Sequence, residues 1–175
     1  PEVIDVDGNV DDRRGTVSIF NGPHPDIRVF DDGEQETGTV SEWLLERSDE
    51  GLAAHEIGIF VRSSDQIERA RSAAQRCNLP FKLLDEQMET TTGKMIISTM
   101  HLAKGLEFRA VVVMACDDEV IPLQERIENV SDNADLEEVY DTERHLLYVA
   151  CTRARDHLLV TSVDPSSEFL DDLVG

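Results

Sequence analysis

One stretch of the chain, from Met95 to Cys116, constrains the fold more than any other. Within it, two apolar runs rich in β-branched residues, 95–98 and 110–116, flank a polar segment. Each run has the composition of a buried strand. A connection that only reversed the chain would not need the residues found between them, which are Thr99, His101, Lys104, Gly105, Glu107 and Arg109. Because ligands of open α/β sheets gather at the carboxyl ends of strands, we expect this segment to be a ligand-binding loop.

Two motifs carry a resemblance to a known family. Residues Ile97–Phe108, I-S-T-M-H-L-A-K-G-L-E-F, resemble motif V of the UvrD/Rep family of superfamily 1 DNA helicases. A later run from Glu143 to Ala154, E-R-H-L-L-Y-V-A-C-T-R-A, resembles motif VI of the same family. The motifs occur in the family's order, and the resemblance extends from about Ile57 to Ser162. It implies the C-terminal, second RecA-like domain of a superfamily 1A helicase.

The resemblance implies an α/β fold of the RecA-like, P-loop NTPase type, in which helices flank a mostly parallel sheet. A length of 175 residues suffices for one such domain. We expect an acidic tether or loop at 1–15 and a single RecA-like C-terminal helicase domain at 16–175. The family's large inserted subdomain is replaced here by about ten residues before Met95. The chain also lacks a phosphate loop, since its one Gly-Lys pair, Gly93-Lys94, is followed by Met95.

Apolar runs, helical periodicity and turn residues predict the other elements. Strands are expected at 16–20, 27–30, 57–61, 81–84, 95–98, 110–116 and 157–162, with 95–98 central in the sheet. Helices are expected at about 39–47, from Ser63 or Ser64 to Cys77, from Asp141 or Thr142 to Thr152, and at 167–173. The acidic segment 124–138 shows no clear period and is expected to be a surface loop. We expect Trp43, the one tryptophan, to pack in the core.

RecA-like motors hydrolyse a nucleotide between two such domains, and the second domain supplies a cation. By resemblance, Arg153 is this arginine finger, a catalytic residue that also contacts the nucleotide. A guanidinium suits the role because its fork of donors can follow the charge on the γ-phosphoryl oxygens. The resemblance also assigns Glu107 to the ribose hydroxyls and Gly105 to close backbone approach. The implied cofactor is ATP with Mg²⁺, whose ligands are expected in the missing first domain. Alternatively, Arg153 is only a helix-end cation that favours the carbonyl end of the helix dipole.

The same resemblance places six residues on the face that binds single-stranded DNA: Arg62, Ser63, Ser64, Thr99, His101 and Lys104. Hydroxyls and lysines can contact phosphate oxygens, and a histidine can stack on a base or donate a hydrogen bond. The alternatives are that the two serines only cap a helix and that Lys104 is only solvated. Within motif VI, we expect Glu143 to orient an arginine through an ion pair and Tyr148 to pack in the core.

The formal net charge of −21 argues against a free-standing nucleic-acid-binding protein, since phosphate neutralisation needs lysine and arginine. Residues 62–110 are the exception, with 8 basic and 6 acidic side chains, against 4 and 16 in residues 111–175. This distribution indicates a local cationic groove or, more simply, chance on a solvated acidic surface. Asp117-Asp118-Glu119 imitates a Walker B motif, but without a phosphate loop we predict no metal site.

The sequence predicts a cytoplasmic protein without a membrane partner. No apolar run approaches the ~20 residues of a membrane helix, and the acidic start lacks the basic region of a signal peptide. Three cysteines without CxxC spacing indicate free thiols in a reducing compartment.

These features predict the C-terminal domain of an ATP-dependent DNA helicase or translocase. The expected partners are single-stranded DNA and the first RecA-like domain of the same full-length protein, and the isolated chain is expected to be inactive. Two alternatives stay open. One is the corresponding domain of a helicase–nuclease, for which the sequence offers no nuclease motif. The other is a non-catalytic acidic α/β interaction module.

Overall fold

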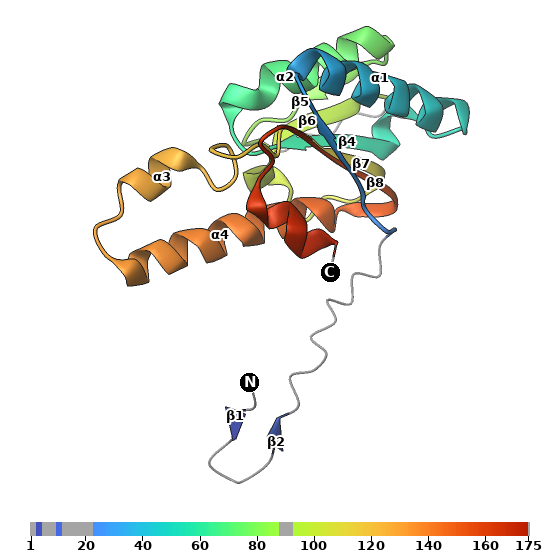
Figure 1. Cartoon of the computed structure of the whole chain (residues 1–175). Helices are drawn as coiled ribbons and strands as arrows, with labels where there is room; N and C mark the ends of the chain where they lie inside the picture. The colour runs from blue at the N-terminus through green and yellow to red at the C-terminus, as the bar shows by residue number, and fades with distance from the viewer. Residues whose placement is uncertain (1–2, 5–9, 12–22, 88–92, 175) are drawn as a thin grey trace.

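The computed structural model describes residues 3–4, 10–11, 23–87 and 93–174. Near the N-terminus, β1 (Val3–Ile4) pairs antiparallel with β2 (Val10–Asp11) (Figure 1). The segment expected to be a tether or loop therefore contains a short pair of strands. The strand expected at 16–20 lies outside the described residues.

A six-stranded parallel sheet forms the centre of the domain, in the order β3-β8-β7-β4-β6-β5 (Figure 1). The strands are β3 (Asp26–Phe30), β4 (Ile57–Val61), β5 (Phe81–Leu83), β6 (Met95–Thr99), β7 (Phe108–Val113) and β8 (Ala154–Val163). The expected α/β fold with a parallel sheet flanked by helices is confirmed.

The interior strands are apolar runs without alternation because helices cover both of their faces. Every residue of β4 is buried, and Gly58 makes room there for an aromatic ring, since a Cβ at this position would lie 2.9 Å from the ring of Phe108. β6 lies between β4 and β5 and is an interior strand. The two middle positions belong to β7 and β4, however, and not to β6 as we expected.

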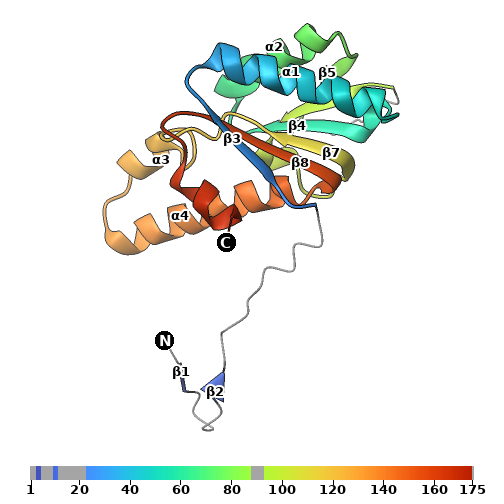
Figure 2. The same ribbon diagram turned by 45° about the vertical axis from the view of Figure 1, so that its right-hand side comes forward.

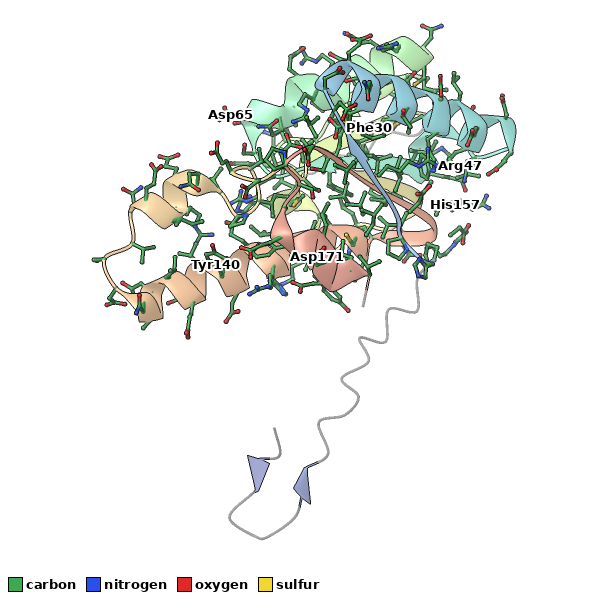
Figure 3. All side chains as sticks on the ribbon, in the orientation of Figure 1. Phe30, Arg47, Asp65, Tyr140, His157 and Asp171 are labelled. Carbon is green, nitrogen blue, oxygen red and sulfur yellow. The ribbon has the colours of Figure 1, made fainter. Side chains whose placement is uncertain are left out.

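Helices form a layer on each face of the sheet (Figure 2). On one face, α1 (Gly33–Asp49) packs against α2 (Ile67–Cys77), and Trp43 of α1 is buried as expected. On the other face, α4 (Asn133–Cys151) lies with the 3₁₀ helix η4 (Glu168–Leu173). Figure 3 shows Tyr140 on α4, whose ring packs edge-on against Phe169 with centroids 5.7 Å apart. Two apolar cores therefore hold the sheet between the helical layers.

The end of α1 is fixed to the start of β8 by a polar contact. Arg47 Nη1 donates to His157 Nδ1 at 3.1 Å, and both side chains are labelled in Figure 3. The same guanidinium lies 4.9 Å from the ring centroid of Trp43 and pairs with Glu50 at 3.1 Å. This cluster sits at the edge of the sheet where β8 begins.

The prediction of a surface loop over 124–138 was wrong. A short helix, α3 (Gln124–Glu128), and the first turns of α4 occupy this segment. α4 begins at Asn133 because Asp132 caps it, accepting a hydrogen bond from the Asp135 N–H at 2.9 Å, and not at 141 or 142 as expected. Tyr148 of α4 is 41% exposed and is therefore not the core residue that we expected.

Other boundaries differ by small amounts. The helix expected from Ser63 or Ser64 starts with a 3₁₀ turn, η2 (Ser64–Gln66), before α2 begins. Another 3₁₀ turn, η1 (Ala54–Glu56), precedes β4. Residues 84–94 join β5 to β6, which leaves no length for the family's inserted subdomain. Among the described residues, no helix has the length and apolar character needed to cross a membrane.

Candidate functional site

The loop between β6 and β7 runs from the carboxyl ends of the parallel strands, called here the carboxyl edge of the sheet, to their amino ends, called the amino edge. β6 ends at Thr99, level with the end of β4, because Val61 and Thr99 are register partners. β7 begins at Phe108, level with the start of β8, because Phe108 and Ala154 are register partners. Since all six strands are parallel, Thr99 lies at the carboxyl edge of the sheet and Phe108 at the amino edge. The predicted site residues therefore fall into two groups at opposite edges.

Apolar residues hold this loop on the face covered by α4. The 3₁₀ turn η3 (Met100–Leu102) lies against α4, and Met100 and Ala103 are buried. Gly105 has a φ of +83°, a conformation that residues with a side chain rarely adopt, so it permits the turn toward β7. The residues left exposed by this arrangement are His101, Lys104, Gly105 and Glu107.

The nucleotide-site candidates Glu107 and Arg153 meet at the amino edge. The Phe108 N–H donates to the Arg153 carbonyl at 2.9 Å, which joins the start of β7 to the residue before β8. The Arg153 guanidinium donates from Nη1 to the Leu106 carbonyl at 3.3 Å. Leu106 and Phe108, which contact Arg153, flank Glu107 in the sequence. The exposed Glu107 carboxylate and the half-buried Arg153 guanidinium therefore lie in one small region with Gly105.

Arg153 also makes the contacts of a helix-end cation. Its Nε donates to the Val149 carbonyl at 3.1 Å, in the last turn of α4, and its Nη2 donates to Thr152 Oγ1 at 3.1 Å. A guanidinium in this position favours the negative end of the helix dipole. The two interpretations of Arg153 are therefore compatible, since one side chain both closes α4 and lies beside Glu107.

A buried carboxylate, Glu143 of α4, organises the carboxyl edge. Arg62 directly follows β4 and donates from Nε and Nη2 to the two Glu143 oxygens, each at 2.6 Å. Arg126 of α3 donates to the same carboxylate from Nη1 at 2.9 Å, and the Leu123 N–H donates at 3.1 Å. Burial would raise the pKa of Glu143, but these partners, with Arg62 foremost, hold that pKa below its usual range. The ion pair that we expected for Glu143 is present.

The structure places Arg62 away from the surface on which we expected it to contact DNA. Its side chain is 3% exposed and its guanidinium is engaged with Glu143. This geometry favours a positioning role over direct contact with DNA. The neighbouring serines differ from it, since Ser64 is exposed and Ser63 is partly exposed. Ser63 makes no side-chain capping bond at the start of η2, so the capping alternative finds no support there.

The remaining DNA-site candidates line the same edge or begin the loop. Thr99 is partly exposed at the end of β6, and Lys104 is exposed further along. His101 lies close enough to the buried network to interact with its charges. Burial lowers the pKa of His101, and so do the cations of Arg62 and Arg126, against an opposing effect of Glu143. His101 therefore presents a neutral ring to solvent near neutral pH.

Sequence reasoning did not identify Arg126, because the helix that bears it was taken for a loop. One signal was available: Arg126 is the one basic residue between Arg109 and Arg144 in an otherwise acidic region. A basic residue retained among so many carboxylates suggests a specific partner. The structure identifies one such partner as Glu143.

Of the acidic triplet that follows β7, Asp117 is held by ion pairs and hydrogen bonds, whereas Asp118 and Glu119 are exposed. Arg69 of α2 pairs with both Glu36 of α1 and Asp117, the latter at 2.6 Å. Asp117 also accepts a hydrogen bond from the Val163 N–H at 2.7 Å. No group of three or more His, Cys, Asp or Glu side chains in the described part of the chain has the arrangement of a metal site. Asp117 thus links α2 to the end of β8.

Comparison with known proteins gives consistent results. The family model of the UvrD-like helicase C-terminal domain matches residues 83–164. DNA helicase II of Rickettsia typhi is 33% identical over 138 residues, which are 78% of this chain and 20% of that protein. ATP-dependent DNA helicase PcrA of Bacillus subtilis is 33% identical over 103 residues, which are 51% of this chain and 13% of that protein. The chain thus spans a fifth or less of these relatives' length.

A solved structure has the same fold. It is described as the C-terminal domain of a possible DNA helicase from Lactobacillus plantarum, with a TM-score of 0.61 and 24% identity over 85% of this chain and 80% of that one. The family match begins in β5 and covers both motifs, the loop between β6 and β7, and Glu143. Residues 83–164 of this chain therefore belong to the family of UvrD-like helicase C-terminal domains.

Proposed function

We propose that this domain is the second RecA-like half of an ATP-dependent DNA helicase or translocase. The observation that carries the proposal is the path of the loop from Thr99 to Phe108. This one segment starts among the DNA-site candidates at the carboxyl edge and ends beside Arg153 and Glu107 at the amino edge. The proposal therefore places the DNA-site and nucleotide-site candidates at the two ends of one continuous loop.

The amino edge supplies half of a nucleotide site. Arg153 is the arginine finger, and Glu107 accepts hydrogen bonds from the ribose hydroxyls beside Gly105. The residues fit ATP because a cation and a carboxylate acceptor lie in one small region. ATP bound with Mg²⁺ supplies the phosphoanhydride that is cleaved, and the Mg²⁺ ligands belong to the first domain. To bind a phosphate, the Arg153 guanidinium can use the N–H groups of Nη1 and Nη2 that its bonds to the Leu106 carbonyl and Thr152 leave free.

The carboxyl edge supplies part of the path for single-stranded DNA. Ser63, Ser64 and Thr99 offer hydroxyls to phosphate oxygens, Lys104 offers a charge, and neutral His101 can stack on a base or donate a hydrogen bond. Arg62 acts at this edge by positioning, through Glu143. The partner on the nucleotide side is the first RecA-like domain of the same protein. A cytoplasmic location without a membrane partner stays a prediction.

The test is the ATPase rate of the complete protein, titrated with single-stranded DNA. We expect DNA to stimulate hydrolysis, and Thr99→Ala to weaken that stimulation while the rate without DNA is kept. A complete protein that neither binds single-stranded DNA nor hydrolyses ATP would refute the motor. A second candidate function is an acidic α/β interaction module, which the net charge of −21 favours. Absence of both DNA binding and ATP hydrolysis would support that candidate.

A further inference from the structure

Two arginines share one buried carboxylate at the carboxyl edge. Arg62 and Arg126 both donate to Glu143, whose side chain is fully buried. The Arg62 side chain is 3% exposed, whereas the Arg126 side chain is 37% exposed. The carboxylate therefore holds one cation inside the domain and one at its surface.

The charges of this cluster do not cancel. Arg62 and Arg126 carry two positive charges and Glu143 carries one negative charge, which leaves one positive charge in excess. His101, the titratable neighbour at this edge, is held neutral by burial and by the two cations, so it adds no charge. The excess belongs to these three side chains, since Glu125 and Glu128 lie on the same short helix as Arg126. An anion at the exposed end of the cluster would balance it.

Arg126 has donors to spare for such an anion. Within the described part of the chain, the one hydrogen bond of its side chain runs from Nη1 to Glu143. Its Nε and Nη2 donate to no group among the described residues, and a guanidinium with two adjacent donors matches the oxygens of a phosphate. Glu143 fixes the orientation of the group, which lowers the entropy lost when a ligand binds.

We propose that Arg126 binds a phosphate of single-stranded DNA, with Glu143 and Arg62 as its positioning residues. This inference rests on the proposed function. A phosphate could come from the DNA backbone or from the nucleotide, and the chemistry of recognition is the same. The position of Arg126 decides for DNA, because Glu143 ties it to Arg62, next to Ser63 and Ser64. The nucleotide candidates Arg153 and Glu107 lie at the opposite edge.

The test measures binding of a fluorescein-labelled oligothymidylate to the complete protein, without nucleotide, across a series of salt concentrations. We expect Arg126→Gln to weaken binding about 5- to 20-fold and to reduce the slope of log K against log salt by about 0.7, the value for one lost phosphate contact on a single strand. Arg126→Lys keeps the charge but loses the fork, so its affinity should fall between those of wild type and Arg126→Gln.

Arg76→Gln is the matched control. Arg76 is an arginine of α2 with a 45% exposed side chain and one ion pair, to Glu34 at 2.6 Å. Its removal changes the net charge by the same amount but should alter the affinity less than twofold. Equal effects of Arg126→Gln and Arg76→Gln would overturn the proposal. A melting temperature measured for each variant ensures that folded proteins are compared. If Arg126→Gln does not fold, the affinity of Arg126→Lys for the oligothymidylate tests the proposal instead.

A second readout separates the two sources of phosphate. Affinity for a fluorescent ATP analogue, measured in the same variants, should stay near the wild-type value in Arg126→Gln. Weaker nucleotide binding with unchanged DNA binding would overturn the assignment to DNA. If the wild-type protein binds no DNA at all, the proposed function fails. If wild type binds DNA and Arg126→Gln binds it equally well, only the inference about Arg126 fails.

Discussion

At the scale of single residues, Arg153 holds the end of α4 and also lies beside Glu107. In the complete protein, Arg153→Ala should lower kcat of the DNA-stimulated ATPase by ~10³, while the affinity for ATP changes less, because the cation acts mainly in the transition state. Arg153→Lys should not restore the rate, since an ammonium lacks the bidentate fork. A near-normal kcat for Arg153→Ala would mean that Arg153 only stabilises the end of α4 and is not an arginine finger.

Glu107→Gln should instead raise KM for ATP, because ribose contacts are equal in ground and transition states.

His101 gives a prediction about pH. Its pKa in the folded protein is lowered below the value of 6.5 that holds for an unperturbed histidine, so protonation opposes folding. The contribution of neutral His101 to the free energy of unfolding is therefore fully present above about pH 6.5, and it is lost as the pH falls from there through the lowered pKa. Urea unfolding of the 175-residue chain at pH 7.0 and pH 5.5 should show a smaller loss of stability for His101→Asn than for wild type.

The matched control for this measurement is His55→Asn. His55 is exposed on η1, near the amino edge of the sheet, away from Arg62 and Arg126. This variant should lose as much stability as wild type over the same pH interval. If His101→Asn also loses as much stability as wild type, the charges of Arg62 and Arg126 do not affect the protonation of His101.

At the scale of elements, Glu143 joins three parts of the fold: the end of β4 through Arg62, α3 through Arg126, and α4 on which it lies. Glu143→Ala should lower the free energy of unfolding by about 3–5 kcal/mol, because it leaves Arg62 buried without a counter-charge. The double variant Arg62→Leu/Glu143→Leu should be more stable than Glu143→Ala, since no unpaired charge stays buried. Urea denaturation of the three proteins tests this order. A loss below about 1 kcal/mol in Glu143→Ala would mean that water reaches the site.

The elements also explain what the sequence could predict. β4 and β6 were located closely because buried parallel strands are continuous apolar runs, whereas β8 starts three residues before the predicted strand, in a stretch that contains Arg155 and Asp156. α3 and the first turns of α4 were missed because their residues are mostly polar and exposed, and the cap at Asp132 starts the helix. Local periodicity gives no strand order, so the middle position of β7 and β4 could not be predicted. The burial of Arg62 could not be predicted, because its partner Glu143 is 81 residues away in the sequence.

The site could be predicted in part. Motif spacing gave the loop residues and Arg153 as candidates, and their roles stay predictions; the structure shows that Arg153 lies beside the end of this loop. Which edge of the sheet each residue occupies depends on the path of the loop across the face covered by α4, and that path requires the three-dimensional structure. The partnership of Arg126 with Glu143 likewise depends on α3 folding back toward α4.

At the scale of the whole molecule, the charge is divided between surfaces. Within the described residues, the α3–α4 segment from Gln124 to Thr142 carries one basic side chain, Arg126, among 7 acidic ones. Such a surface repels a DNA backbone and keeps other proteins of like charge at a distance. In the proposed complex, we expect DNA to contact this segment at Arg126 alone and otherwise to follow the loop on which Lys104 is exposed.

The last prediction concerns the chain alone. It has no phosphate loop, so the purified 175-residue protein should hydrolyse no ATP above background in the presence of Mg²⁺ and single-stranded DNA. A finger raises the rate only for a nucleotide that another domain holds in line, so Arg153 by itself has no substrate to act on. The assay needs Arg153→Ala as its control, because a contaminating ATPase would be unaffected by this change. Turnover that copurifies with the wild-type chain and disappears in Arg153→Ala would show that the domain forms a complete site, and the division of labour between two RecA-like halves would have to be abandoned.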